Sequence, residues 1–258
     1  MTPKLSIITI NLNNRAGLMA TINSVISQTF KDYEFFIMDG NSDDGSLDII
    51  EQNREHINFW QSEPDSGIFN AMNKAIKLAK GEYLLFLNSG DCLTSNNALE
   101  DFIKHKLFQG DIIYGDYQYE KGGKVYPDHL SPYYFMRTSL PHQSTLFHQS
   151  VFELMGYYDE TYKMVSDRAF YLKCFLSGKF TFTHIPYALT LFDLHGFSND
   201  ANYKNKKKKE DERMFRELYG LYYNDMKTIT TLHQKLSECQ RNTSYGILKR
   251  FKKRMGWK

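Results

Sequence analysis

A short apolar run that ends abruptly in a polar turn constrains this chain more than any other feature. Residues 83–87 are apolar without interruption, and the polar residues 88–91 follow directly. An apolar run of this length predicts a strand that is buried on both faces, as in a parallel sheet covered by helices. Ligands of such sheets bind beyond the carboxyl ends of the strands. We therefore expect Asp91 to meet a substrate or a metal ion, unless it only caps the helix that starts near Asn96 or lies in a solvated turn.

Three earlier segments repeat this pattern. Residues 5–10, 33–38 and 58–61 are strand-like, and each gives way to polar residues before apolar side chains recur at three- and four-residue spacing. The last of these helical segments covers residues 68–79. Strands that alternate with helices in this way predict an α/β fold, in which a doubly wound, mostly parallel central sheet is flanked by helices.

The second half of the chain is less regular and is expected to extend the same sheet. Its pattern predicts a helix over 98–107, a strand over 111–114, a hairpin at 122–123, a strand over 144–148, helices over 151–155 and 169–176, and a β-rich segment over 180–192. From residue 204 onward the pattern is helical. We therefore expect one domain over residues 1–203, with halves of about 1–110 and 111–203, and a helical C-terminal extension over 204–258.

Composition excludes several classes of protein. With 41% hydrophobic and 15% aromatic residues the chain can bury a full core, so it is not disordered. A net charge of +2 gives no reason to expect nucleic acid as a partner. The three cysteines have no paired spacing, which favours reduced thiols and a cytoplasmic location. From the pattern of residues 1–10 we expect no signal peptide, and no apolar stretch approaches the roughly 20 residues of a membrane span, so any membrane contact is expected to be peripheral.

Five segments together resemble a known family. Residues 6–11, 39–45, 63–68, 71–75 and 86–91 occur in the order typical of family 2 glycosyltransferases, and the likeness covers residues 4–195. It is strongest to the bacterial enzymes that build surface polysaccharides. The resemblance implies a GT-A fold whose first half binds the nucleotide and whose second half faces the acceptor. It also implies inverting transfer of a hexosyl or N-acetylhexosaminyl group from a nucleotide-sugar, a UDP-sugar, to a hydroxyl of a lipid-linked saccharide.

By this resemblance, donor binding falls to seven residues: Thr9, Asn11, Asp39, Asp65, Asn73, Lys74 and Ser89. A carboxylate can accept a hydrogen bond from the imide N–H of uracil, and Asp39 is the expected residue for this. Lys74 stands two positions after Met72, where many relatives have arginine, and whether it replaces that charge is open. Helix capping and turn formation are the alternative roles for Asp39 and Asp65.

The resemblance also implies a divalent metal ion, Mn²⁺ or Mg²⁺. The acidic motif of the family reads Asn88-Ser89-Gly90-Asp91 here, so only Asp91 keeps its carboxylate. One carboxylate together with substrate phosphates can hold such a hard cation. His195 is the second expected ligand, or a contact to the diphosphate, with an ordinary loop histidine as the alternative.

The general base is expected at the start of the helix over residues 169–176. In relatives it is the aspartate of an acidic pair that opens such a helix, which points to Asp167, and Asp159 is the second candidate. Asp167 would otherwise only complement the helix dipole. His142 matches a segment that in relatives lies near the acceptor or the donor sugar. An inverting reaction needs such a base to take the proton from the acceptor hydroxyl.

The C-terminus is basic, with cationic runs at 206–209 and 249–254. The second run is interleaved with apolar residues, which indicates either a membrane-surface helix or a solvated helix face. A non-catalytic nucleotide-sugar-binding scaffold of a polysaccharide assembly complex is the alternative to an enzyme. A sugar-nucleotide pyrophosphorylase is disfavoured because residues 11–15 lack a glycine-rich phosphate loop, and a glycoside hydrolase is the weakest alternative.

Overall fold

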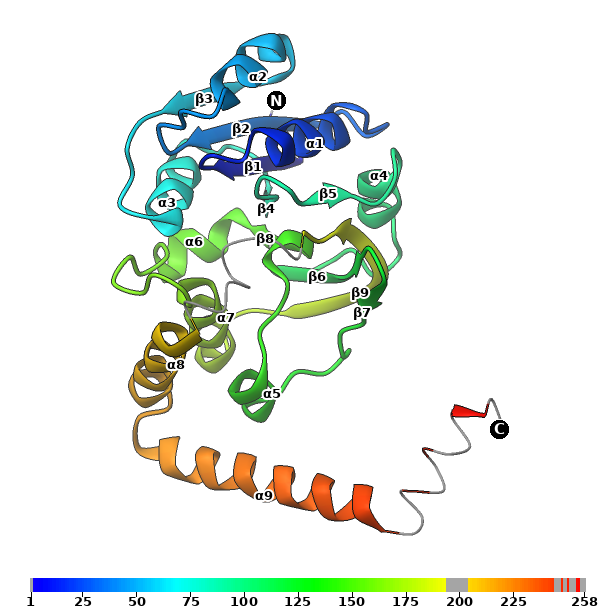
Figure 1. The fold of residues 1–258 in the computed structure, drawn as a ribbon, viewed down its shortest axis with the longest axis vertical. Coiled ribbons are helices and arrows are strands. Elements are labelled where there is room, and N and C mark those ends of the chain that lie inside the picture. Colours follow the sequence, from blue (N-terminus) through cyan, green and yellow to red (C-terminus); the bar gives the residue numbers. More distant parts are fainter. Residues whose placement is uncertain (1, 194–203, 244–246, 248–249, 251–253, 256–258) are drawn as a thin grey trace.

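The fold is seen in a computed structural model that describes residues 2–193, 204–243, 247, 250 and 254–255 (Figure 1). In the first half, strands and helices alternate along the chain: β1 (Leu5–Asn11), α1 (Arg15–Ile26), β2 (Tyr33–Asp39), α2 (Ser46–Gln52), β3 (Phe59–Ser62), α3 (Ile68–Leu78) and β4 (Tyr83–Phe86). This order is the predicted one, and the polar turn at residues 88–91 follows β4 as expected.

The second half contains the remaining strands and helices: β5 (Cys92–Leu93), α4 (Ala98–Ile103), β6 (Ile112–Tyr119), β7 (Gly122–Lys124), α5 (Pro132–Arg137), β8 (Thr145–His148), α6 (Gln149–Met155), α7 (Ser166–Ser177), β9 (Phe182–Leu191), α8 (Lys204–Tyr219) and α9 (Tyr223–Asn242). Four of these differ from expectation. Strand β5 was not predicted. Helix α4 ends earlier than predicted. Strand β6 is longer, because β9 pairs with it from Ile112 to Gln118. Helix α5 was not predicted.

All the described strands form one sheet in the order β3-β2-β1-β4-β8-β6-β9-β5, with β7 paired to β6. The four strands of the first half run parallel, and β6 runs parallel to β9. The pairs β4–β8, β6–β8 and β5–β9 are antiparallel. Strand β4 lies where the parallel half joins the second half, so the turn after it stands at the centre of the molecule.

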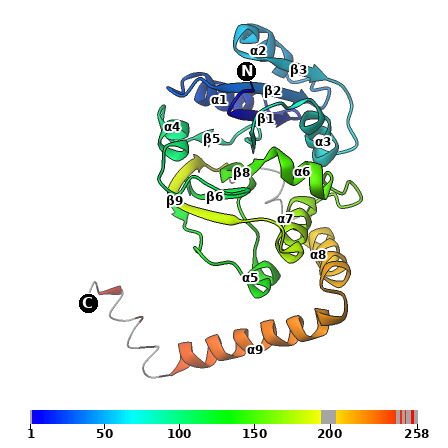
Figure 2. The same cartoon turned by 180° about the vertical axis from the view of Figure 1, so that it is seen from behind.

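Side-chain alternation along the strands divides the core between the two faces of the sheet. In β1, Leu5 and Ile7 join the apolar cluster that includes α1, α2 and α4, whereas Ile8 and Ile10 join the cluster that includes α3, α6 and α7. All four side chains are buried. Helices therefore cover both faces, as Figures 1 and 2 show, and the predicted flanked α/β sheet is confirmed.

The C-terminal helices α8 and α9 follow one another in the chain, with α8 beside α7 and α9 at the base of the molecule (Figure 1). Helix α8 contributes Met214 and Phe215 to the same apolar cluster as α7. Helix α9 lies beside α5, where the rings of Tyr133 and His233 stack with centroids 4.5 Å apart. Helices α2 and α9 lie at opposite ends of the long axis of the molecule (Figure 1). Within the described part of the chain, every helix is too short or too polar to cross a membrane.

Candidate functional site

The turn after β4 is held in place by helix α1. The hydroxyl of Thr21 donates a hydrogen bond to the carbonyl of Asp91 over 2.8 Å and accepts one from the N–H of Gly90 over 3.0 Å. The N–H of Asp91 also donates to the carbonyl of Asn88 over 2.9 Å. Gly90 has φ +105°, a left-handed conformation that favours glycine. The turn therefore fixes the direction in which the Asp91 side chain leaves the sheet.

Asp91 is buried beside a second carboxylate. Its Oδ1 accepts a hydrogen bond of 3.0 Å from the N–H of Asp193, and only 4% of the residue is exposed. Burial raises the pKa of Asp91 to about 6, although the charge of His142 and the bond from Asp193 oppose this rise. A Cβ placed on Gly90 would lie 2.7 Å from Oδ2 of Asp193, so both carboxylates adjoin this turn. Sequence reasoning missed Asp193, although it follows directly on the predicted strand over 180–192.

Two adjacent carboxylates fit a hard divalent cation better than one. Among the residues that the structure describes, no three side chains of His, Cys, Asp or Glu are grouped to hold a metal ion. The carboxylates of Asp91 and Asp193 carry oxygen atoms of the type that Mg²⁺ and Mn²⁺ prefer, and these ions commonly complete their coordination with water and substrate phosphates. The side chains present thus fit a cation that protein and diphosphate share. His195, the other expected ligand, lies outside the described residues.

Asp167 and His142 meet where α7 begins. Oδ2 of Asp167, in the first turn of the helix, lies 3.7 Å from Nδ1 of His142. Nε2 of the same imidazole lies 3.2 Å from Nδ2 of Asn88. Burial would raise the pKa of Asp167, but the attraction of the His142 imidazolium outweighs it and the pKa is lowered. Burial would lower the pKa of His142, and the contacts with Asp167 raise it instead. The two side chains therefore stabilise each other in their charged forms.

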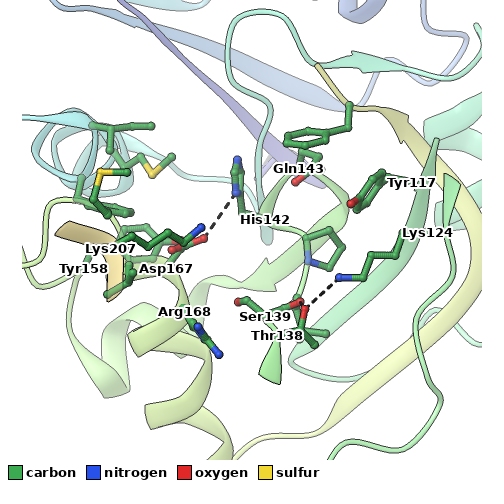
Figure 3. Close-up of a pocket in the computed structure, with 18 of the residues that line it drawn as sticks. Tyr117, Lys124, Thr138, Ser139, His142, Gln143, Tyr158, Asp167, Arg168 and Lys207 are labelled. Carbon is green, nitrogen blue, oxygen red and sulfur yellow. Dashed lines mark hydrogen bonds and ion pairs between the residues drawn. The ribbon is translucent and has the colours of Figure 1, made fainter. Parts of the chain in front are cut away.

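His142 and Asp167 line a pocket of about 400 Å³, a size typical of small-molecule sites. Figure 3 shows the imidazole pointing toward the carboxylate within this pocket. Residues Ile68, Phe69 and Met72 of α3 contribute apolar lining. The other candidate base, Asp159, is exposed, and its carboxylate accepts a hydrogen bond from the N–H of Thr161 over 2.9 Å. Asp159 thus supports a turn and lies outside the pocket lining.

Asp39 is the centre of a hydrogen-bond cluster at the carboxyl end of β2. Its Oδ1 accepts from Asn11 Nδ2 over 2.7 Å and from Ser42 Oγ over 2.6 Å. Its Oδ2 accepts from Ser62 Oγ over 2.6 Å and from the N–H of Ser42 over 2.9 Å. Burial would raise the pKa of Asp39, but the bonds from Ser42, Ser62 and Asn11 outweigh it and lower the pKa. The structure therefore holds Asp39 as an anion next to Asn11.

Asp65 lies against this cluster. A Cβ added to Gly40 would lie 3.1 Å from Oδ2 of Asp65. The other carboxylate oxygen of Asp65, Oδ1, accepts a hydrogen bond from the N–H of Gly67 over 2.8 Å. Gly40 follows Asp39 directly. Three of the predicted donor-binding residues, Asn11, Asp39 and Asp65, thus lie at one edge, where strands β1, β2 and β3 end.

Thr9 and Ser89 are tied into the backbone of the protein. Thr9 is buried, and its hydroxyl donates to the carbonyl of Leu87 over 2.7 Å. The carbonyl of Ser89 accepts from Nδ2 of Asn14 over 3.0 Å. These bonds connect β1 and α1 to the turn after β4. Any role of these two residues in donor binding stays a prediction.

Asn73 and Lys74 of α3 are also bonded within the protein. The amide of Asn73 donates to the Tyr158 carbonyl and to Glu160 Oε1, both over 2.9 Å, and accepts from the Tyr158 N–H over 3.0 Å. Lys74 forms an ion pair with Glu63. Asn73 thus fixes the 158–160 loop against α3, and the donor roles of both residues stay predictions.

Comparison with known proteins places the chain in a family. Residues 6–171 match the family described as Glycosyl transferase family 2. A protein of Mycobacterium bovis named PGL/p-HBAD biosynthesis glycosyltransferase is 31% identical over 183 residues, which are 67% of this chain and 70% of that protein. Poly(ribitol-phosphate) beta-N-acetylglucosaminyltransferase TarP of Staphylococcus aureus is 37% identical over 130 residues, 48% of this chain and 39% of TarP.

Solved structures agree with the fold. Residues 1–349 of S. aureus TarS, crystallised in complex with UDP-GlcNAc, match with a TM-score of 0.67 and 19% sequence identity, over 88% of this chain and 70% of that one. At this level of identity the likeness shows the fold alone. It agrees with the GT-A architecture expected from the sequence.

Proposed function

Because the chain belongs to glycosyl transferase family 2, we propose that it moves a sugar from a nucleotide-sugar to a hydroxyl of a saccharide acceptor, with inversion at the anomeric carbon. The proposed donor is a UDP-sugar that carries a hexosyl or N-acetylhexosaminyl group. The complex of TarS with UDP-GlcNAc supports this choice, as does the N-acetylglucosaminyl transfer named for TarP. The donor edge would comprise Asn11, Asp39 and Asp65, with Asp39 accepting from the base.

The main support for this proposal is that His142 contacts both the turn that carries Asp91 and the pocket wall that carries Asp167. The imidazole touches Asn88, which lies in the turn of Asp91, and Asp167, which stands at the wall of the pocket. A donor whose diphosphate lies near Asp91 would thus present its sugar close to Asp167. This is the arrangement that in-line attack by an acceptor hydroxyl requires.

The reaction follows from the charge states of these side chains. Asp167, which its lowered pKa keeps anionic, accepts the proton of the acceptor hydroxyl. The hydroxyl oxygen bonds to the anomeric carbon, and the bond from that carbon to the phosphate oxygen breaks, so that the nucleoside diphosphate leaves. His142 positions Asp167 and offsets its charge until the proton arrives. A divalent cation at Asp91 and Asp193, Mn²⁺ or Mg²⁺, would offset the charge of the diphosphate.

The proposed setting is bacterial surface polysaccharide synthesis at the cytoplasmic face of the cell membrane. The polymer named for TarP supports a glycan or polyol acceptor, and we extend this to an acceptor on a lipid carrier. The basic residues 249–254 would hold the protein at the anionic lipid surface. Nucleic acid has no part in this proposal.

A donor screen tests the function. Purified protein is incubated with UDP-, GDP- and dTDP-sugars, with Mn²⁺, Mg²⁺ or EDTA and a lipid-linked saccharide extract, and release of nucleoside diphosphate is measured. We expect metal-dependent release from one donor, and we expect Asp167→Asn to reduce it by about 100-fold or more with donor affinity retained. Asp159→Asn is the matched control, because Asp159 is an exposed carboxylate outside the pocket.

Two outcomes would contradict the proposal. Full turnover in Asp167→Asn would remove that residue from catalysis. Donor binding without diphosphate release, under every metal and with acceptor present, would instead support the non-catalytic scaffold.

A further inference from the structure

The pocket has a polar end that the proposed reaction does not use. Lys124, Thr138 and Ser139 line it across from Asp167, as Figure 3 shows. We infer that the acceptor carries an acidic group, a phosphate or a carboxylate, and that this group binds to Lys124, Thr138 and Ser139. The inference rests on the proposed function and names the class of acceptor.

Lys124 is a cation without an anionic partner in the described part of the chain. It ends β7 and is half-buried, and its Nζ donates to Oγ1 of Thr138 over 3.1 Å. The ammonium also lies 4.5 Å from the centroid of the Tyr126 ring. Burial lowers the pKa of Lys124. An ammonium that is partly removed from water and pairs only with a hydroxyl and a ring is poised to bind an anion.

Ser139 adds an unused donor next to this cation. Its Oγ is buried and has no hydrogen-bond partner among the residues that the structure describes. Leaving such a group unpaired costs about 1–3 kcal/mol, so a ligand that accepts its hydrogen bond gains affinity. An ammonium with two neighbouring hydroxyl groups provides donors for several oxygen atoms of one phosphate or carboxylate.

The pocket as a whole is cationic. Its lining contains the single carboxylate of Asp167, which pairs with His142, and five further cationic residues: Lys124, Arg137, Lys163, Arg168 and Lys207. Arg168 is neutralised by Asp211 at 2.6 Å, and the charge of Lys207 acts on Asp167. The remaining excess of positive charge attracts an anionic substrate.

The donor diphosphate is the other possible source of negative charge, and the geometry disfavours it. Asp39 and Asp65 of the donor edge do not line this pocket, and neither does Asp91, the proposed metal ligand. Lys124 approaches from the β6–β7 hairpin of the second half, whereas the donor edge is built by β1, β2 and β3. The anion at Lys124 is therefore assigned to the acceptor.

Binding measurements on the full chain test this assignment without turnover. Saturating UDP and diamagnetic Mg²⁺ first occupy the donor edge, and Kd values for glucose, glucose 6-phosphate and glucuronate are then measured by ligand-observed NMR. We expect the two acidic sugars to bind about tenfold more tightly than glucose, as for one charge-assisted contact. Lys124→Met should abolish this preference and Lys124→Arg should keep it.

Lys121→Met is the matched control, because Lys121 is exposed in the turn of the same hairpin and should leave the preference intact. Ser139→Ala, which removes no charge, should weaken glucose 6-phosphate binding about threefold or more. This variant still tests the inference if Lys124→Met fails to fold.

The inference is overturned if glucose binds the wild-type protein as tightly as glucose 6-phosphate, or if Lys124→Met retains the preference. A parallel loss of UDP affinity in Lys124→Met would assign the lysine to the donor and also overturn it. Failure of the donor screen is a separate result, since these measurements require no transfer.

Discussion

At the scale of single residues, His142 decides how the base is held. Its Nε2 faces the amide of Asn88, and the Oδ1 of that amide is buried with no hydrogen-bond partner in the described chain. A protonated imidazole donates from Nε2, and the amide turned by 180° would accept there through Oδ1. The raised pKa of His142 favours this protonated form, which places a positive charge next to Asp167.

The pH dependence of stability should reveal this pair. The pKa of His142 is raised, so its stabilising contribution is complete below about pH 6.5 and is lost as pH rises through the folded-state value. The pKa of Asp167 is lowered, so its contribution is present above about pH 4 and is lost as pH falls. We expect His142→Gln to reduce the free energy of unfolding more at about pH 5.5 than at about pH 9.

Urea unfolding at both pH values measures this difference. His129→Gln is the control, because His129 is exposed and should change stability little at either pH. If His142→Gln reduces the free energy of unfolding equally at both pH values, the proposed charge interaction between His142 and Asp167 is refuted.

At the scale of elements, Arg168 holds helix α8 against helix α7. Arg168 of α7 forms an ion pair with Asp211 of α8 at 2.6 Å, and the two side chains are 12% and 21% exposed. The guanidinium also lies 4.8 Å from the Phe215 ring centroid and donates to the carbonyl of Phe135 over 2.7 Å. Burial raises the pKa of Asp211 even though Arg168 opposes this, so removing the arginine would leave a buried carboxylate uncompensated.

Arg168→Leu should therefore lower the free energy of unfolding by about 3 kcal/mol, as when one partner of a buried pair is lost. Chemical denaturation gives this value directly. Arg216→Leu, which breaks the exposed pair between Arg216 and Glu212 of α8, should change the free energy of unfolding far less, because water screens an exposed pair. Equal losses in the two variants would show that α8 does not depend on this contact.

Local sequence signals explain which elements could be predicted. Helix α5 starts at Pro132 after Ser131, whose hydroxyl accepts from the N–H of Tyr134 over 3.1 Å, and this Ser-Pro start was available in the sequence. Strand β5 has two residues and exists only because it pairs with Thr190 and Leu191 of β9. A strand of two residues is too short to show a periodic pattern in the sequence.

At the scale of the whole molecule, helix α9 carries an exposed apolar face. On α9, Ile229, Leu232 and Leu236 are 40%, 58% and 54% exposed, and their spacing places them on one face. The basic run at 249–254 follows in the sequence. We propose that this apolar face and the basic run, most of which lies outside the described residues, together bind an anionic lipid surface.

Vesicle flotation checks this arrangement. We expect the protein to bind vesicles that contain phosphatidylglycerol, to bind phosphatidylcholine vesicles weakly, and to be released when salt shortens the Debye length from about 10 Å to 3 Å. Replacing the five basic residues within 249–254 by glutamine should abolish binding. The same change at 206–209 on α8 is the matched control and should have a smaller effect. Binding that survives loss of the C-terminal charges would contradict this role.

The sequence by itself determined the sheet of the first half, the turn that carries Asp91, and the helix start that carries Asp167. These features depend on runs of apolar residues and on the polar residues next to them, and such patterns are local. The tertiary structure alone decided which side chains meet. His142 and Asn88 are 54 residues apart in the chain, and Asp193 reaches Asp91 across 102 residues.

The same limit applies to residues whose position was foreseen and whose bonds were not. From the sequence alone, a polar residue whose side chain is bonded inside the protein, such as Thr9 or Asn73, cannot be distinguished from a polar residue that binds a ligand. Only the folded chain shows that its hydrogen bonds are made to backbone groups far along the chain. The anion-binding end of the pocket at Lys124 and Ser139 is likewise a product of packing, because it requires a hairpin and a loop that lie side by side only in the folded protein.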